Sequence, residues 1–205
     1  MRINTNGWNK IRYTVYSPGY DLAAGILKES RKKSIESLNI KQGDKVLIIG
    51  AGTGLDLEYL PRYCHITATD ITPSMIDRII KRNKKLKRNV QALVMDGQNL
   101  EFTDNSFDFV ILHLILTVIP DPVACIKEVE RVLKQGGQVI IYDKFIRNHK
   151  KVSLFRSVLN IFTSLLFSDI TKDAHSIIDT TGLIIQSDLE ADFNGNFRLI
   201  KLIKE

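Results

Sequence analysis

Cysteine is scarce in this 205-residue chain, which contains only Cys64 and Cys125. The two lie far apart, and neither belongs to a group of residues with metal-ligand spacing. The sequence therefore predicts neither a disulfide framework nor a metal site. We expect both thiols to be reduced and to have only a structural role.

Long apolar runs are also missing. Residues 1–9 contain no apolar segment of the kind that a secretory signal needs. The most hydrophobic stretch, residues 152–167, is interrupted by Arg156, Asn160 and Thr163, and it is shorter than the roughly 20 apolar residues of a spanning helix. We therefore expect no cleaved signal, no transmembrane helix and a cytoplasmic location.

No internal repeat, low-complexity segment or Pro/Gly/Ser-rich linker divides the chain, so a single domain is expected. Acidic residues are in deficit, with 23 Asp and Glu against 29 Lys and Arg and a net charge of +6. Such an excess favours acidic partners, for example anionic lipid or nucleic acid. The basic residues are not interleaved with aromatic residues that could stack on bases, so we expect no nucleic-acid partner.

The chain does contain a regular alternation of short apolar runs and helical patterns. Strands are expected at residues 45–50, 65–69, 90–94, 107–112 and 138–142, with helices at about 54–59, 73–86 and 122–133. Continuous apolar runs are typical of parallel strands buried on both faces, and alternation with helices implies right-handed crossovers. We predict an α/β fold of Rossmann-like, doubly wound type, with a mostly parallel seven-stranded sheet.

The two ends of the chain depart from this alternation. Residues 20–38 predict one long helix, and residues 152–180 predict a second helical region. Two apolar runs near the C-terminus are separated by Asn194-Gly195-Asn196, which indicates a hairpin. The single domain is thus expected to comprise four parts: an N-terminal helical lid (1–40), a cofactor-binding core (41–143), a helical insert (144–182) and a closing antiparallel hairpin (183–205).

A glycine run, Gly50-Ala51-Gly52-Thr53-Gly54, follows the first expected strand. Glycines permit a tight turn and a close approach of a ligand to the backbone N–H groups at a helix N-terminus. Three interpretations compete: a dinucleotide loop, an S-adenosylmethionine loop and a turn with incidental glycines. A dinucleotide fingerprint has its third small residue three positions after the second glycine. This chain has Leu55 there, so the spacing favours methyl transfer over hydride transfer.

Carboxylates stand at the ends of the next two expected strands. Asp70 lies 20 residues after the first glycine, where it can accept both hydrogen bonds from a ribose diol. Helix capping is the competing interpretation of Asp70, although Thr72-Pro73 already supplies an N-cap and a first helical residue. Asp96-Gly97-Gln98 ends the third strand, where a carboxylate can accept from an adenine amine. Three strand ends therefore point to one ligand.

These segments, with Phe107-Asp108 and Leu133-Lys134-Gln135-Gly136-Gly137, resemble class I S-adenosylmethionine-dependent methyltransferases over about residues 40–143. The resemblance implies S-adenosylmethionine as the cofactor. The residues that it implies for the site are Gly50, Ala51, Gly52 and Gly54 at the methionine end, Asp70 at the ribose, Ile71 and Met75 against the adenine, Asp96, Gly97 and Gln98 at its amine, and His113 below the cofactor. For His113, a purely structural hydrogen-bonding role is the alternative.

One position departs from the family pattern. An acidic residue often stands two positions before the first glycine and ties down the cofactor loop, but this chain has Ile48 there. We therefore expect the loop to be held differently.

The acceptor side is less specific. The overall resemblance is to bacterial phosphatidylethanolamine N-methyltransferases and, with much of the same signature, to quinone-ring C-methyltransferases. Tyr16 and Tyr20 are expected at the catalytic site, because aromatic faces suit a cationic amine; a hydrophobic staple is the alternative for this segment. A neutral amine needs positioning more than a strong base, whereas a phenol, carbon acid or carboxylate would need a base such as His113 or Lys144.

The expected function is methyl transfer from S-adenosylmethionine to a small molecule or lipid headgroup, with a phosphatidylethanolamine-type amine favoured. Quinone-ring or other C- or O-methylation is the alternative. A non-catalytic S-adenosylmethionine-binding module and a nicotinamide-dependent oxidoreductase are the rival classes. The basic run 78–88 is either a solvated helix end or a contact with an anionic membrane at its inner face. Residues 152–167 either lie in that interface or form a buried lid or dimer contact. Nothing indicates the oligomeric state.

Overall fold

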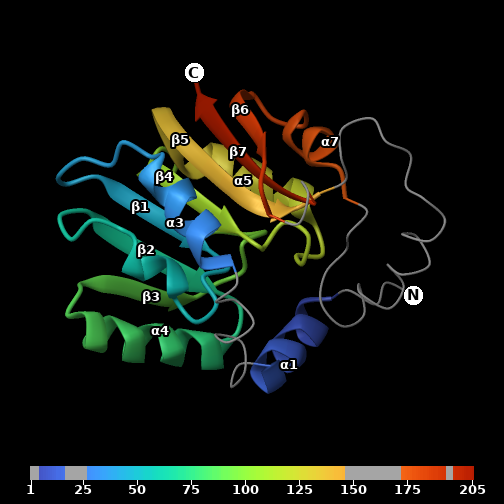
Figure 1. Ribbon diagram of the computed structural model, residues 1–205. Helices are drawn as coiled ribbons and strands as arrows, with labels where there is room; N and C mark the ends of the chain where they lie inside the picture. The colour runs from blue at the N-terminus through green and yellow to red at the C-terminus, as the bar shows by residue number, and fades with distance from the viewer. Residues whose placement is uncertain (1–4, 17–26, 146–171, 193–195) are drawn as a thin grey trace.

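The structure is a computed structural model that describes residues 5–16, 27–145, 172–192 and 196–205 (Figure 1). Seven strands form one sheet in the order β3-β2-β1-β4-β5-β7-β6. The first five pair in parallel, and β7 pairs antiparallel with both β5 and β6. The strands are β1 (Lys45–Ile49), β2 (His65–Asp70), β3 (Val90–Val94), β4 (Phe107–His113), β5 (Leu133–Lys144), β6 (Leu183–Glu190) and β7 (Phe197–Lys204). The predicted doubly wound sheet with its closing hairpin is confirmed.

The helical elements of the described chain are α1 (Asn6–Tyr16), α3 (Lys28–Glu36), the 3₁₀-helix η2 (Leu55–Glu58), α4 (Pro73–Leu86), α5 (Pro122–Val132) and α7 (Ala174–Ile178). Helix α4 begins as predicted, with Thr72 at the N-cap position and Pro73 in the first turn. The Thr72 side chain makes no capping hydrogen bond, and the Thr72 N–H instead donates to the Asp70 carboxylate at 2.9 Å. The strand-end aspartate therefore contributes to the start of α4.

Several predicted boundaries are wrong. Residues 6–16 were expected in a tail and form α1, while the described part of the long helix expected at residues 20–38 is only α3. Residues 55–58 form a single 3₁₀ turn rather than an α-helix. Of the helical region expected at residues 152–180, residues 152–171 lie outside the described chain and the remainder contains α7.

The glycines after α5 do not close that helix. Helix α5 ends at Val132, and β5 begins at once with Leu133, so that Gly136 and Gly137 lie inside a twelve-residue strand. The pairing of β4 with β5 jumps from Phe107 opposite Leu133 to Phe109 opposite Gln138. Gly136 has φ 73°, which a glycine adopts without strain, and it permits this irregularity in the ladder.

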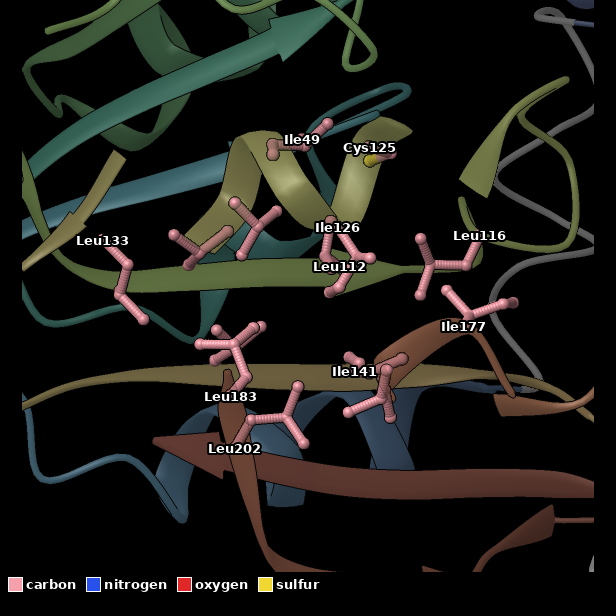
Figure 2. Packing of buried hydrophobic residues seen from close by; sticks show 14 of the residues in the cluster. Ile49, Leu112, Leu116, Cys125, Ile126, Leu133, Ile141, Ile177, Leu183 and Leu202 are labelled. Carbon is pink, nitrogen blue, oxygen red and sulfur yellow. The ribbon is translucent and has the colours of Figure 1, made fainter. Parts of the chain in front are cut away.

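The core consists of two layers, one on each face of the sheet. Alternate residues of β1 point to opposite faces, so Leu47 and Ile49 pack with α5 and α7, whereas Val46 and Ile48 pack with α3, η2 and α4. Figure 2 shows the first layer, in which α5 and α7 cover Leu112 and Ile141 of the central strands. Cys64 and Cys125 are buried and free, as expected.

None of the helices in the described part of the chain has both the length and the apolar character needed to cross a membrane. The described residues also contain no group of three or more side chains suited to hold a metal ion.

Candidate functional site

A cavity with an empty volume of about 620 Å³ opens at the carboxyl ends of β1, β2 and β3. This is the side of an open α/β sheet where ligands bind, next to the point where the strand order reverses between β1 and β4. Seven of the residues predicted for the cofactor site line it: Gly50, Gly52, Asp70, Ile71, Met75, Asp96 and Gly97.

The glycine loop has a backbone that other residues would adopt only with strain. Gly50, Gly52 and Gly54 have φ values of 66°, 56° and 79°. A Cβ on Gly50 would stand 2.6 Å from the Cδ1 atom of Ile115, so this side of the loop has no room for a side chain. Glycine at position 50 therefore leaves the backbone bare toward the cavity.

Three residues predicted to contact the cofactor lie behind or beside the cavity instead of lining it. Ala51 is buried in the core layer that contains α4. Gly54 adopts the left-handed conformation that starts η2, and a Cβ there would stand 3.1 Å from the Cδ1 atom of Leu57. Gln98 holds the Asp96 carboxylate through its own backbone and side-chain N–H groups. These residues shape the site from behind.

Asp70 ties the glycine loop to α4. One of its carboxylate oxygens accepts from the Gly52 N–H at 2.9 Å, and the other accepts from the Thr72 N–H at 2.9 Å. Burial raises the pKa of Asp70, and these two backbone donors oppose the rise. Each oxygen has a second lone pair, so the carboxylate can accept further hydrogen bonds from a ligand in the cavity.

The missing acidic residue at position 48 is thereby offset. Ile48 is buried in the core, and the loop is held by Asp70 on one side and by Arg82 on the other. The Arg82 Nε donates to the backbone oxygen of Thr53 at 3.0 Å, while its guanidinium pairs with Glu58. This agrees with the expectation from the sequence that the glycine loop is held differently from the family pattern.

His113 lies outside the cavity lining, in a buried polar cluster on the α3 side of the sheet. Its Nδ1 is 2.9 Å from Asp56 Oδ1, and its Nε2 is 2.9 Å from the hydroxyl of Ser34. Arg31 contacts both oxygens of Asp56, at 2.8 and 3.0 Å. Both ring nitrogens of His113 are therefore engaged, and the arrangement matches the structural alternative for this residue.

The cluster joins three elements, and sequence analysis missed three of its members, Arg31, Ser34 and Asp56. Arg31 comes from α3, Asp56 from η2 and His113 from the end of β4. Burial alone would raise the pKa of Asp56, but the charge of Arg31 and the contact with His113 hold it well below its ordinary range. The only signal in the sequence is a carboxylate two residues after the glycine run.

Lys144 is the other candidate on the acceptor side whose side chain the structure describes. Lys144 does not line it, and its Nζ lies 5.7 Å from the centroid of the Phe197 ring. Burial lowers the pKa of Lys144, and the neighbouring Asp143 opposes the shift. Tyr20 and the side chain of Tyr16 lie outside the described residues.

Two asparagines that the sequence did not single out also line the cavity. Asn6 and Asn9 of α1 both face the cavity, and Asn6 donates to Asp96. The predicted helix of the N-terminal part began only at residue 20, and Tyr16 was the one residue of α1 that was considered for the site.

Comparison with known proteins assigns the family. A family described as a methyltransferase domain matches residues 47–141, which include the glycine loop and both strand-end carboxylates. The phosphatidylethanolamine N-methyltransferase of Cereibacter sphaeroides is 31% identical over 153 residues, which are 72% of this chain and 73% of that protein. The chain belongs to the class I S-adenosylmethionine-dependent methyltransferases.

Other proteins similar to this methyltransferase have names that refer to other substrates or to none. The demethylmenaquinone methyltransferase of Staphylococcus saprophyticus is 33% identical over 117 residues, so the chain spans 50% of its length. The YcgJ protein of Bacillus subtilis has a TM-score of 0.73 at 18% identity and matches 86% of this chain and 98% of its own, which supports the fold alone.

The methyltransferase uses S-adenosylmethionine as its cofactor. The residues present fit this molecule, because glycine at position 50 leaves room for a ligand and two carboxylates, which are acceptors for hydroxyl and amine donors, line the same cavity. A Cβ on Gly97 would approach Ile49 to 2.6 Å, which shows how closely the cavity floor is built.

Proposed function

We propose that the cavity holds the cofactor with its methionine end at Gly50 and Gly52, its ribose at Asp70 and its adenine beside Asp96. The support is that these residues line one cavity in this order, from β1 through β2 to β3. Ile71 and Met75 supply apolar surface between the two carboxylates. When bound, S-adenosylmethionine supplies a methyl group activated by a sulfonium.

The proposed acceptor is an amine of a small molecule or lipid headgroup, of the phosphatidylethanolamine type. The observation that carries this proposal is the similarity to a phosphatidylethanolamine N-methyltransferase over nearly three quarters of that protein. The phosphoethanolamine N-methyltransferase 1 of Arabidopsis thaliana is also similar, at 31% identity over 136 residues. The chemistry agrees, because an amine brings its own lone pair and needs chiefly to be positioned.

The described residues are arranged for positioning. The ionisable residues among those lining the described cavity are Asp70 and Asp96, which stand at the ends proposed for the ribose and the adenine. His113 is engaged by Asp56 and Ser34, so it serves in this proposal to fix η2 behind the loop rather than to take a proton from the acceptor.

Quinone-ring methylation is the second candidate. The demethylmenaquinone methyltransferases of several Staphylococcus species favour it, at 28–33% identity. Their identity to this chain is about the same as that of the phosphatidylethanolamine N-methyltransferase, so the choice between nitrogen and ring carbon depends on a direct test of acceptors.

Two measurements, made one after the other, test the proposal. Calorimetry with S-adenosylhomocysteine tests the cofactor site, and we expect saturable binding; a folded protein that gives no heat at millimolar ligand would exclude it. Labelled S-adenosylmethionine is then incubated separately with phosphatidylethanolamine vesicles, demethylated quinones and small amines. We expect label in the lipid or amine products, whereas label only in the quinone would establish the second candidate.

The methyltransferase is further proposed to work in the cytoplasm at the inner face of a membrane, where a lipid headgroup would be available. The support is a groove on α4 lined by Arg78, Lys81 and Lys85. Arg82 and Arg88 of the same basic run have structural partners, namely Glu58 and the backbone oxygens of Leu60 and Pro61.

A further inference from the structure

The first residue of α1 occupies the carboxylate proposed for the adenine amine. The side-chain N–H of Asn6 donates to Asp96 Oδ2 at 2.6 Å, and the Asn6 side-chain oxygen accepts from Gln98 Nε2 at 3.2 Å. Asn6 also lines the cavity itself. A side chain from the N-terminal helix thus stands at the adenine end of the site, 90 residues away in sequence from the group that it contacts.

Donors already approach both oxygens of the Asp96 carboxylate. Its Oδ1 receives the backbone N–H of Gln98 at 3.0 Å, and its Oδ2 receives the Asn6 side-chain N–H at 2.6 Å. The Gln98 Nε2 lies 2.9 Å from Oδ1, 3.1 Å from Oδ2 and 3.2 Å from the Asn6 oxygen; because it carries only two hydrogens, the one that does not face Asn6 is shared between the two carboxylate oxygens. Asn6 is therefore the donor at Oδ2 that lines the cavity, and an adenine amine that approaches Oδ2 from the cavity competes with it.

Asn6 is the donor that can leave. The Gln98 donors are adjacent in sequence to Asp96 and remain there with the loop, whereas Asn6 belongs to a separate helix that lies outside the sheet, close to the start of α4 (Figure 1). Asn6 is also chemically equivalent to its competitor, because a carboxamide N–H and an adenine amine N–H are both neutral donors to the same oxygen.

Helix α1 is seated by polar contacts. Among its described side chains, the two that are buried are Asn9 and Arg12, whereas Trp8 is 36% exposed and Ile11 is 61% exposed. The Asn9 amide donates to the backbone oxygen of Val118 at 3.3 Å, and Arg12 donates to the Asn9 oxygen at 2.7 Å. A helix end held by exchangeable hydrogen bonds can be displaced by a ligand that offers the same bonds.

We propose that Asn6 sets the affinity of the cofactor site by competing with the adenine amine for Asp96, so that cofactor binding releases the N-terminal end of α1. This inference rests on the proposed placement of adenine beside Asp96. It makes Asn6 a determinant of cofactor affinity that lies in α1, outside the strand ends and loops that supply the other proposed cofactor contacts.

The test compares Asn6→Ala with the wild-type protein by calorimetry. Removal of the competitor should tighten S-adenosylhomocysteine about 5–10-fold, because a hydrogen bond to a charged acceptor no longer has to be exchanged. Lys10→Ala is the matched control, since Lys10 is an exposed residue of α1 that lies away from the cavity lining. Its affinity should equal that of the wild type.

A deaminated analogue separates competition from a general effect of α1. S-Inosylhomocysteine has a carbonyl oxygen in place of the amine and cannot donate to Asp96 from that position. Asn6→Ala should therefore change its affinity by less than about 2-fold, against the larger gain for S-adenosylhomocysteine. Equal gains for both ligands would overturn the proposal.

The release of α1 has an optical readout, because Trp8 is the only tryptophan of the chain and lies two residues from Asn6. Saturation with S-adenosylhomocysteine should shift its emission in the wild type, and the free Asn6→Ala protein should already show part of that shift. An unchanged or weakened affinity in Asn6→Ala, or unchanged Trp8 emission, would overturn the proposal. If neither the wild type nor Asn6→Ala binds S-adenosylhomocysteine, the proposed position of the cofactor in the cavity is wrong. If only Asn6→Ala binds it, the result supports competition between Asn6 and the adenine amine.

Discussion

The carboxylate of Asp70 both stabilises the local fold and lines the proposed cofactor site. Its carboxylate holds the Gly52 and Thr72 N–H groups and still faces the cavity. Asp70→Ala should weaken S-adenosylhomocysteine binding by about 1.5–3 kcal/mol, because charge-assisted hydrogen bonds to the ribose are lost. Calorimetry at neutral pH measures this change.

Asp70→Asn is the matched control, because it keeps one acceptor oxygen in place. We expect it to lose less affinity than the alanine variant. Wild-type affinity in Asp70→Ala, in a protein with an unchanged circular dichroism spectrum, would remove Asp70 from the cofactor site.

Gly97 shows why a glycine follows the carboxylate of β3. A Cβ there would stand 2.6 Å from the Cγ2 atom of Ile49 and 3.3 Å from the Cδ1 atom of Ile119. Gly97→Ala should lower the free energy of unfolding by about 1–3 kcal/mol, because an overfilled core must shift. Urea unfolding measures this loss.

Gly7→Ala is the control, since a Cβ at Gly7 in α1 meets nothing within 4 Å. It should be neutral or stabilising by up to about 1 kcal/mol, and a loss as large as that of Gly97→Ala would contradict the steric argument.

At the scale of elements, one buried cluster links α3, η2 and β4. Arg31 and His113 each contact Asp56, so the turn that follows the glycine loop is held from two sides. The three side chains are nearly inaccessible to solvent. Removal of one member of such a cluster leaves a buried charge without its partner, which costs about 3–5 kcal/mol.

The same cluster predicts an acid-dependent loss of stability. The pKa of Asp56 is lowered in the folded protein, so its contribution is complete above the ordinary carboxyl value near 4 and is lost as the pH falls below it toward the folded value. Asp56→Asn should be less stable by about 3–5 kcal/mol at pH 7 and should lose less than the wild type on acidification. Urea unfolding between about pH 7 and pH 3 compares the two slopes.

Asp108→Asn provides the control for that experiment. Burial raises the pKa of Asp108, but hydrogen bonds from Lys134 and Lys45 outweigh it and leave the pKa lowered. Because Asp108 is more exposed than Asp56, its pairs are screened by solvent and its loss at pH 7 should be smaller. Equal losses in the two variants would show that burial of the cluster does not set its strength.

The elements that could be predicted are those whose pattern reflects burial. The central strands β1 and β4 are short apolar runs because parallel strands in the middle of the sheet are covered on both faces. The predicted ranges of β1 to β4 agree with the structure to within one residue at each end. Helix α1 was missed because Gly7 and Thr14 weaken its helical pattern, and its seat on the cavity depends on side chains far away in sequence.

At the scale of the molecule, the right-handed crossover rule restricts the strand orders that a parallel sheet can have, and ligands bind at the carboxyl ends of its strands. The carboxyl ends of β1 to β3 must then meet, which is why Gly50, Asp70 and Asp96 could be assigned to one site from the sequence. The contact of Arg31 with Asp56 could not be predicted, because nothing in local spacing tells which face of α3 meets η2. The choice between the two roles of His113 could not be made from the sequence for the same reason, since its position at a strand end does not say which side of the sheet its ring occupies.

The charge of the whole molecule carries the last prediction. With a net charge of +6 and a groove of Arg78, Lys81 and Lys85, the methyltransferase should co-sediment with anionic vesicles and not with neutral ones, and this binding should fall as salt is raised to about 0.5 M. Each basic residue near such a surface contributes about 1 kcal/mol. Replacing all three by serine should therefore weaken vesicle binding by roughly 100-fold.

A variant in which Lys33, Lys41 and Lys127 are replaced by serine is the control, because it removes the same charge from exposed residues outside the groove. If that control loses as much binding, net charge alone attracts the protein and the α4 groove is not the membrane contact.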